Sequence, residues 1–282
     1  MGSEMCIRDR FDKEHIAVRL RPKTVGPYRR LIETHIRPKF GSVPVAAVSR
    51  ADVAKWHHAM QKTPVEANRA LMLLHKIFSM AELWGLRDGT NPAHGVPKFK
   101  ETPRERYLNA DELYRIGKAI SDLQVDHERP LSPHIALAFR LLLLTGMRRD
   151  EVLTLKWDYI DLTAGRIDLP DSKTGPKTVA LSTAAIDLLK GAPREEGSPW
   201  VVTSSRRSSD GAWSHVVNPA KAWQRVKERA STEDEKLPSV NVLDVTLHDC
   251  RPVSYTHLRA HETPEHLVCR LPLEKKKNIN HP

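Results

Sequence analysis

Residues 134–155 read HIALAFRLLLLTGMRRDEVLTL and decide the fold of the second half of the chain. The first part, His134 to Leu144, is apolar around every face of a helix, so it predicts a helix that is buried on all sides. Thr145-Gly146 is expected to end this helix, because glycine readily adopts the left-handed conformation of a helix C-terminus. A short second helix, Arg148 to Leu155, is expected to follow.

Short strands and further helices are expected after this stretch. Between Tyr159 and Ser182 apolar and polar residues alternate, which predicts strands joined by the turn-forming pairs Ala164-Gly165 and Thr174-Gly175. Helices are expected again at 183–190 and 218–230. Strands and helices do not alternate in the way that builds a parallel sheet. The second half is therefore expected to be α+β, with a small antiparallel β-sheet.

The first part of the chain is patterned as helices alone. One helix is expected from Lys23 to an end near Pro38 and Gly41, and another after Ser49, which has Asp52 at the capping-box position. The longest helix should run from Pro64 to Trp84, and a polar, proline-rich connector follows it. The whole chain is thus expected to be mainly α with a small antiparallel sheet.

The composition limits what the chain does. Among its 282 residues, 45 Lys and Arg outnumber 35 Asp and Glu, for a net charge of +10, so an anionic partner is expected. The longest apolar stretch, Ile135 to Met147, is interrupted by Arg140 and is too short to span a bilayer. No basic amphipathic segment ends in an aromatic anchor, so no membrane partner is expected. The three cysteines exclude a disulfide scaffold, and a cytoplasmic protein that binds nucleic acid is favoured.

Both ends of the chain are interpreted as foreign to the fold. DNA that encodes residues 2–10 can be written so that its reverse complement encodes VSYTHLRA, residues 253–260. Unrelated peptides are rarely complementary in this way, and the shared DNA resembles the adapter of transposon-based sequencing libraries. The chain is therefore expected to be a fragment of a longer gene product. The basic excess remains after both ends are excluded.

Excluding these ends changes which motifs count. The run His261 to His266 misses the HExxH zinc spacing by one residue, contains a helix-breaking Pro264 and lies in the foreign part, so no metal site is expected. Cys250 is then the one native cysteine. The expected organisation is a foreign segment (1–10), a helical unit (11–98), a linker (99–108), a mixed unit (109–252) and a second foreign segment (253–282).

Three local patterns in the second unit carry the functional interpretation. They are TGMRRDE at residues 145–151, SKTG at 172–175 and LHDCR at 247–251. Each is weak by itself, because exposed arginines, turn lysines and chance HxxR spacings are common on protein surfaces. Their order and separation are more specific than any one of them.

In this order the three patterns resemble the tyrosine recombinase, or phage integrase, family. The similarity covers nearly all of residues 21–251, and KTVGPYRRLIETHIRPKFG and NRALMLLHKIFSMAELWGL in the first unit resemble the family's helical core-binding domain. The resemblance implies that a mixed α+β catalytic domain follows, here truncated. Glu151 matches the acidic position of the first pattern, to which we assign a structural role. The catalytic residues that the resemblance implies are Arg148, Lys173, His248 and Arg251.

These residue types suit DNA cleavage by metal-free transesterification. The guanidinium groups of Arg148 and Arg251 would bind the non-bridging oxygens of a pentacoordinate phosphorus. Lys173 in a β-hairpin would protonate the 5′-oxygen, which is otherwise a poor leaving group. His248 would bind the phosphate and assist proton transfer at the nucleophile. No cofactor and no metal ion are implied.

The family's nucleophile is a tyrosine that forms a 3′-phosphotyrosine bond, and this tyrosine is expected to be missing here. Four of the tyrosines precede His248, and Tyr255 lies four residues after Arg251, within the foreign segment. The chain is therefore predicted to bind DNA weakly at best and not to cleave it. The full-length protein would act on double-stranded DNA as a homotetramer, in the cytoplasm and on the nucleoid of a bacterial or phage-infected cell.

Further DNA contacts are expected from basic residues on two predicted helices of the first unit. These residues are Lys23, Arg29, Arg30, Arg69 and Lys76. A solvated polar face explains each of them almost as well. In the second unit, the polar run Ser204 to Ser209 is expected to be a loop, together with Trp213 and His215.

Three other functions fit the sequence less well. A non-catalytic DNA-binding protein would use the helical unit alone and would not need the three patterns in recombinase order. A penicillin-recognising serine hydrolase, suggested by Lys173-Thr174-Gly175, needs an SxxK pair, and no serine of the chain has lysine at the third following position. A P-loop enzyme needs a glycine before Lys173, where this chain has Ser172.

Overall fold

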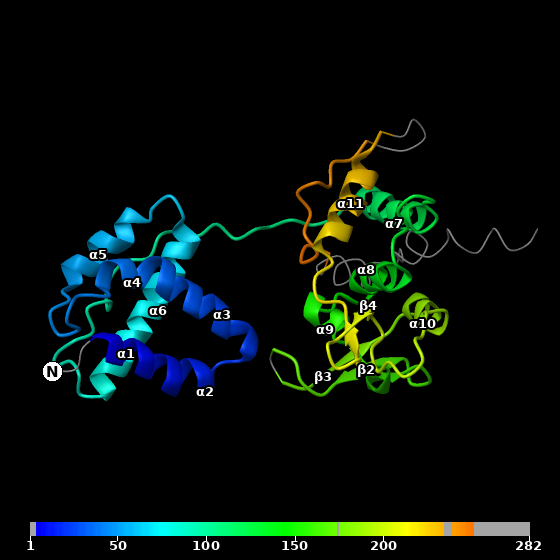
Figure 1. Ribbon diagram of the computed structural model, residues 1–282. Helices are drawn as coiled ribbons and strands as arrows, with labels where there is room; N and C mark the ends of the chain where they lie inside the picture. The colour runs from blue at the N-terminus through cyan, green and yellow to red at the C-terminus, as the bar shows by residue number, and fades with distance from the viewer. Residues whose placement is uncertain (1–3, 174, 234–238, 251–282) are drawn as a thin grey trace, which may run out of the picture. The chain divides into compact units, whose positions relative to one another are not determined.

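The computed structural model describes residues 4–173, 175–233 and 239–250, and the chain divides into two units, residues 1–104 and 105–282 (Figure 1). Each unit has a hydrophobic core of its own. Among the helices of the described part, none is long and apolar enough to cross a membrane.

Several residues for which the sequence predicts a role or a foreign origin lie outside the described part. They are Arg251, Tyr255, the run His261 to His266 and the rest of the segment 253–282 that is interpreted as foreign. Their predicted roles remain predictions.

Unit 1 is helical, as expected. Figure 1 shows α6 running through the unit, and α1, α3, α5 and the π-helix η2 all contact it. Its elements are α1 (Glu4–Phe11), the π-helix η1 (Asp12–Ile16), α2 (Ala17–Arg19), α3 (Pro22–Leu31), the π-helix η2 (Ile32–Ile36), α4 (Arg37–Phe40), α5 (Arg50–Ala59) and α6 (Pro64–Leu83).

Local sequence signals explain most helix ends in unit 1. The predicted capping box is present before α5, since Asp52 N–H donates to Ser49 Oγ at 3.2 Å and Ser49 N–H donates to Asp52 Oδ2 at 3.1 Å. The earlier helical segment ends at Phe40, between Pro38 and Gly41, where its end is predicted. The π-helical turn η2 precedes this proline and places it in the first turn of α4, where proline is tolerated.

The core of unit 1 lies along α6. Leu74 and Phe78 of this helix are almost fully buried, and Phe11 and Val53 are fully buried. Ile7, which belongs to the segment 1–10 interpreted as foreign, is also buried, with 6% of its surface exposed. The described part of that segment therefore folds as a helix of unit 1.

The connector between the units is shorter than the expected 99–108. Phe99 N–H donates to Asn68 Oδ1 and Asn68 Nδ2 donates to Phe99 O, both at 2.9 Å. The His57 ring stacks on that of Phe99, with centroids 4.4 Å apart. At the other end, Leu108 is buried in the core of unit 2. Both ends of the expected linker are thus attached to a unit, because they offer apolar side chains and backbone groups that pair.

Unit 2 combines helices with short antiparallel strands, as expected. A capping box begins the helix after Asn109, with the Asn109 side chain and Glu112 paired reciprocally. Its elements are α7 (Ala110–Gln124), α8 (Pro133–Thr145), α9 (Arg149–Leu153), the 3₁₀-helix η3 (Trp157–Tyr159), β1 (Ile160–Asp161), β2 (Arg166–Leu169), β3 (Lys177–Ala180), α10 (Thr183–Lys190), β4 (Thr203–Arg207), β5 (Trp213–His215) and α11 (Ala220–Ser231).

The helix α8 is the buried centre of unit 2, as its sequence predicts. Phe139 packs edge-on against Trp223 of α11, with ring centroids 5.0 Å apart. Arg140 is buried as well, and its guanidinium donates to two polar side chains of α7 at 2.7 and 3.0 Å. Gly146 ends the helix with φ +60°, a conformation that favours glycine. The position of Arg148, two residues later, is therefore set by the core.

Two small antiparallel sheets complete unit 2. The strands β1, β2 and β3 form one sheet in sequence order, and Leu169 pairs with Lys177 where the β2–β3 hairpin begins. The prediction of a loop at Ser204 to Ser209 is wrong, because β4 and β5 pair as a second sheet that includes Trp213 and His215. Serines and arginines hide this strand from an analysis of apolar alternation.

Candidate active site

Arg148 lies immediately before α9 and directly after the buried Met147. Its backbone N–H donates to Glu151 Oε2 at 3.0 Å, and its Nη1 donates to Glu151 Oε1 at 2.7 Å. One carboxylate thus fixes both the backbone and the guanidinium of Arg148, whose side chain is 27% exposed. The other N–H groups of the guanidinium can donate to a second anion.

A second cation shares the same carboxylate. Lys177 of β3 donates from Nζ to Glu151 Oε2 at 3.2 Å, and only 8% of the Glu151 side chain is exposed. Burial opposes the ionisation of Glu151, but the hydrogen bonds from Arg148 and Lys177 together hold its pKa below the usual value. Glu151 is therefore ionised at neutral pH, and this cluster of two cations and one anion is net positive.

Lys173 lies in the turn that joins β2 to β3. Ser172 N–H donates to Gly175 O at 3.0 Å, and Gly175 N–H donates to Ser172 O at 3.3 Å, which closes the turn. Gly175 has φ +100°, where a side chain would strain the backbone. Lys173 is exposed, so its ammonium is accessible from outside the protein.

His248 lies in a turn near the last described residues. The Asp249 carboxylate accepts from the backbone N–H of Thr246 at 2.8 Å and from its hydroxyl at 2.9 Å. Asp249 and Cys250 are buried, whereas His248 is exposed. Burial raises the pKa of the Cys250 thiol to about 12, so this cysteine is a neutral core residue. Arg251 lies outside the described residues.

The structure joins part of the predicted site. It brings Arg148 and Glu151 together and adds Lys177, which the sequence analysis missed. Within the described ranges, no hydrogen bond or ion pair links Lys173 or His248 to Arg148. A lysine in a strand ordinarily indicates a solvated position, but Lys177 lies on the half-buried face of β3. The alternation of half-buried and exposed residues along this strand is the one sequence signal that pointed to this position.

Two of the basic residues predicted to contact DNA in unit 1 are paired with carboxylates. Arg29 donates from Nε and Nη2 to the two carboxylate oxygens of Asp12, both at 2.8 Å. Arg30 donates from Nη2 to Glu66 Oε1 at 2.6 Å. All four side chains are at least 31% exposed, so water screens both pairs.

A hollow of about 430 Å³ between α3 and α6 brings two of the predicted DNA contacts together. Arg30 and Arg69 both line it, together with Glu66. Lys23 and Lys76 are exposed on the same two helices but do not line this hollow. The predicted basic residues are thus placed on the surface of unit 1, and two of them are grouped.

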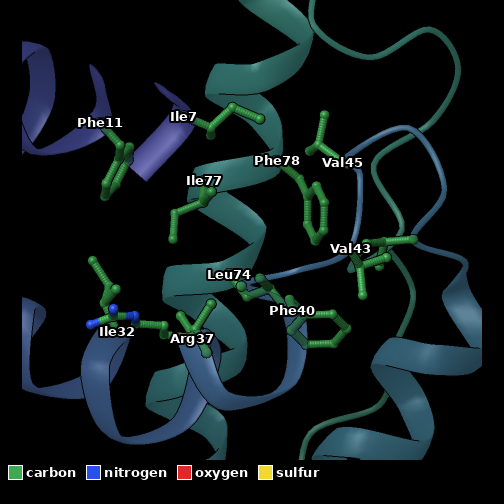
Figure 2. Close-up of a pocket in the computed structure, with 13 residues that line it drawn as sticks. Ile7, Phe11, Ile32, Arg37, Phe40, Val43, Val45, Leu74, Ile77 and Phe78 are labelled. Carbon is green, nitrogen blue, oxygen red and sulfur yellow. The ribbon is translucent and has the colours of Figure 1, made fainter. Parts of the chain in front are cut away.

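A separate, apolar pocket of about 240 Å³ lies in unit 1 (Figure 2). Figure 2 shows Ile7 and Phe11 on one side of it and Phe40 and Phe78 on another. Among the residues that line it, Arg37 is the one charged side chain, and its Nη1 donates to Glu33 at 2.6 Å. The lining supplies no acid, base or nucleophile, so we assign no chemistry to this pocket.

Each unit matches a described protein family. Residues 106–271 match the phage integrase family, and residues 9–61 match the phage integrase N-terminal SAM-like domain. The first match extends into the segment 253–282, and the second begins within residues 1–10, so both overlap the ends interpreted as foreign.

Curated relatives of the chain are named as recombinases or integrases. The chain is 29% identical over 213 residues to a shufflon-specific DNA recombinase of Escherichia coli, a match that covers 71% of this chain and 53% of that protein. It is 29% identical over 172 residues to an integrase of Escherichia phage HK022, which covers 60% of this chain and 45% of that protein. The chain spans about half the length of the curated relatives it matches.

Solved structures share the fold. A lambda integrase dimer (residues 75–356) bound to a COC′ core site matches with a TM-score of 0.67 and 19% identity, over 95% of this chain and 94% of that chain. A lambda integrase tetramer bound to a Holliday junction matches with the same TM-score and identity, over 95% of this chain and 76% of that chain. At this level of identity the likeness concerns the fold.

Proposed function

Because the chain belongs to the phage integrase family, we propose that its two units are the DNA-binding and strand-cleaving parts of a site-specific recombinase. Strands would be broken and rejoined by transesterification, through a 3′-phosphotyrosine intermediate that conserves the energy of the phosphodiester. The relatives named as recombinase and integrase support this class of reaction. The structural neighbours bound to DNA support double-stranded DNA as the partner.

The proposal rests mainly on the position of the Arg148 guanidinium, which is held on one edge and partly exposed. Glu151 holds one edge of its guanidinium, while more than a quarter of the side chain stays exposed. Lys177 adds positive charge, so the cluster attracts an anion although it contains a carboxylate. A guanidinium that is fixed before the substrate arrives is what stabilisation of a charged transition state requires.

The proposed chemistry divides the reaction among four side chains. Arg148 and Arg251 bind the non-bridging oxygens as the tyrosine oxygen forms a bond to phosphorus and the bond to the 5′-oxygen breaks. Lys173 gives its proton to the departing 5′-oxygen, and His248 assists removal of the tyrosine proton. The exposure of Lys173 and His248 supports these roles, since both must reach a DNA strand outside the protein.

This polypeptide is proposed to lack the nucleophile. Four tyrosines precede His248 in the chain, and Tyr255 lies only four residues after Arg251. The family position is tens of residues further along, as the resemblance implies. We therefore expect the chain to bind DNA without forming a covalent bond to it.

The partners of the complete recombinase follow from the same proposal. The tetramer seen for lambda integrase on a Holliday junction supports a homotetramer on DNA. The hollow lined by Arg30 and Arg69 is proposed to lie against phosphates. The reaction would take place in the cytoplasm, on the nucleoid, of a bacterial or phage-infected cell.

DNA binding by the complete chain tests the first part of the proposal. We expect a fluorescent duplex to bind at low salt and to dissociate as salt rises, measured by fluorescence anisotropy. Arg148→Ala should lower the slope of log K against log salt by about one, since one phosphate contact is lost. A protein that read DNA with unit 1 alone would keep its slope in this variant, and no binding at low salt would overturn DNA as the partner.

A suicide DNA substrate tests the second part. After incubation with the chain and denaturing electrophoresis, we expect no covalent protein–DNA adduct. An adduct would contradict the proposed lack of a nucleophile. Comparison with Tyr255→Phe would then show whether Tyr255 is the residue that forms it.

A further inference from the structure

The β2–β3 hairpin is attached to the segment that carries Arg148 through a shared carboxylate. Lys177 stands at the start of β3, opposite Leu169 of β2, and Lys173 lies four residues before it in the connecting turn. Its Nζ donates to Glu151 Oε2, the oxygen that also accepts from the backbone N–H of Arg148. A cation on the hairpin and the start of α9 therefore share one acceptor atom.

The surroundings make this contact stronger than other ion pairs of the same sheet. The Glu151 side chain is 8% exposed and that of Lys177 is 32% exposed, so water competes little for the carboxylate. Arg166, on β2, pairs instead with Asp168, and both of these side chains are 50% exposed. An exposed pair of this kind contributes little to the order of a hairpin.

We propose that Lys177 is a positioning residue of the strand-cleaving site, which holds the hairpin that carries Lys173 against the turn that carries Arg148. This inference rests on the proposed function, in which Lys173 is the general acid and Arg148 binds the phosphate. Lys177 itself reaches the reacting atoms only through Glu151. Its ammonium also keeps Glu151 ionised, so Arg148 retains the acceptor that orients its guanidinium.

The first test measures the titration of Glu151 by NMR of its side-chain carboxyl carbon in the complete chain. Lys177→Met removes one of the donors to the carboxylate and should raise the pKa of Glu151 toward its usual value. Lys177→Arg keeps a donor and should restore a low pKa. Arg166→Met removes the same charge from the same sheet and should leave Glu151 unchanged. An unchanged titration in Lys177→Met would overturn the proposal.

The second test measures hydrogen exchange of the backbone amides of residues 171–173 and 175 in the hairpin turn. Exchange there should become about tenfold faster in Lys177→Met, because one charge-assisted hydrogen bond at the base is lost. Exchange in α8 should not change, and Lys177→Arg should return the turn to the wild-type rate. Faster exchange throughout unit 2, or in Arg166→Met to the same extent, would show a general loss of stability and would contradict a positioning role.

The third test separates this inference from the proposed function. Acetylation of lysines, read by mass spectrometry, should show Lys173 protected by a duplex at low salt, and less protected in Lys177→Met. If the duplex does not protect Lys173 in the wild-type chain, the assignment of Lys173 to DNA cleavage fails. If it protects Lys173 equally in both chains, the role of Lys177 fails.

Discussion

Two sets of cations, one in each unit, are held by carboxylates that differ in burial. In unit 1, Arg29 pairs with Asp12 and Arg30 pairs with Glu66, and these carboxylate side chains are 34% and 31% exposed. In unit 2, Arg148 and Lys177 share one carboxylate, Glu151, whose side chain is 8% exposed. The carboxylates of the first set are partly exposed to water, whereas that of the second set is nearly buried.

This difference decides which cations are free to change partners. An exposed ion pair contributes little to stability, so a phosphate can replace the carboxylate at small cost. A phosphate cannot replace the cations' contact with a buried carboxylate at small cost, because these cations would then leave a charge unpaired where water is scarce. Unit 1 is thus suited to reversible contact along DNA, and unit 2 to a fixed site with spare donors.

The largest effect is expected from removal of the shared carboxylate. Glu151→Ala leaves Arg148 and Lys177 without their acceptor and leaves the Arg148 backbone N–H unpaired. Breaking a buried ion pair from one side costs about 3 kcal/mol. Hydrogen exchange in α8, measured at increasing urea concentrations, should show this loss of unfolding free energy in unit 2.

The matched control is the acid partner of Arg30. Glu66→Ala removes a partly exposed carboxylate that pairs with Arg30 and His35, and should change the urea midpoint of unit 1 far less than Glu151→Ala changes that of unit 2. Equal destabilisation by the two substitutions would refute the contrast between the units.

The elements of unit 2 that lead to Arg148 could be predicted because several local signals agree there. The apolar stretch of α8, the glycine at its end and the alternation of β2 and β3 all specify the same structure. The β4–β5 sheet was not predicted because its strands have few apolar residues, and the π-helical turn η2 was not predicted because such a turn has no sequence signal of this kind.

Only those residues of the candidate site that belong to a sequence motif could be predicted from the sequence. Arg148 and Glu151 are three residues apart, so the first turn of α9 brings them together without help from the rest of the fold. Lys177 meets Glu151 across 26 residues, through the packing of a hairpin on a helix start. Such a contact depends on tertiary structure, and one sequence does not specify it.

A smaller effect is expected at Asn68, a buried and neutral polar residue of unit 1. Asn68 is 2% exposed and binds both backbone groups of Phe99, and its Oδ1 also contacts His57 Nε2 at 3.1 Å. Asn68→Ala leaves these groups unpaired and should cost unit 1 about 2 kcal/mol. Hydrogen exchange in α6, measured at increasing urea concentrations, gives this loss of unfolding free energy. Gln61→Ala, at an exposed position, is the control, and an equal effect there would contradict the assignment.

The response to acid should also differ between the units. Burial lowers the pKa of His15 and His57 below 6.5, so the unfolded chain binds protons first and unit 1 loses stability as pH falls below 6.5. Burial works against ionisation of Glu112 and Glu151, but hydrogen bonds hold each pKa below 4.5, so these two groups lower the stability of unit 2 only as pH falls below 4.5. Hydrogen exchange at pH 7 and pH 5.5 should therefore show weakening in unit 1 alone.

One histidine substitution isolates this acid response. His57→Gln removes a group that must gain a proton on unfolding, so it should reduce the loss of stability of unit 1 between pH 7 and pH 5.5. His58→Gln, at the exposed neighbouring position, should leave the pH dependence as it is in the wild-type chain. The contrast would be wrong if unit 2 weakened first, or if both substitutions acted alike.

The smallest effect on stability, and the clearest on DNA binding, is expected at Arg30. Its side chain is 68% exposed and its one carboxylate partner is screened, so Arg30→Ala should leave the urea midpoint of unit 1 nearly unchanged. If a phosphate replaces Glu66 in the complex, the same substitution should lower the salt slope of duplex binding by about one. Arg37→Ala, which removes an arginine with a similar exposed partner but outside the hollow, should keep the slope. Equal slopes for wild type and Arg30→Ala would mean that the exposed pair persists on DNA, so exposure alone would not make a cation of unit 1 available to phosphate.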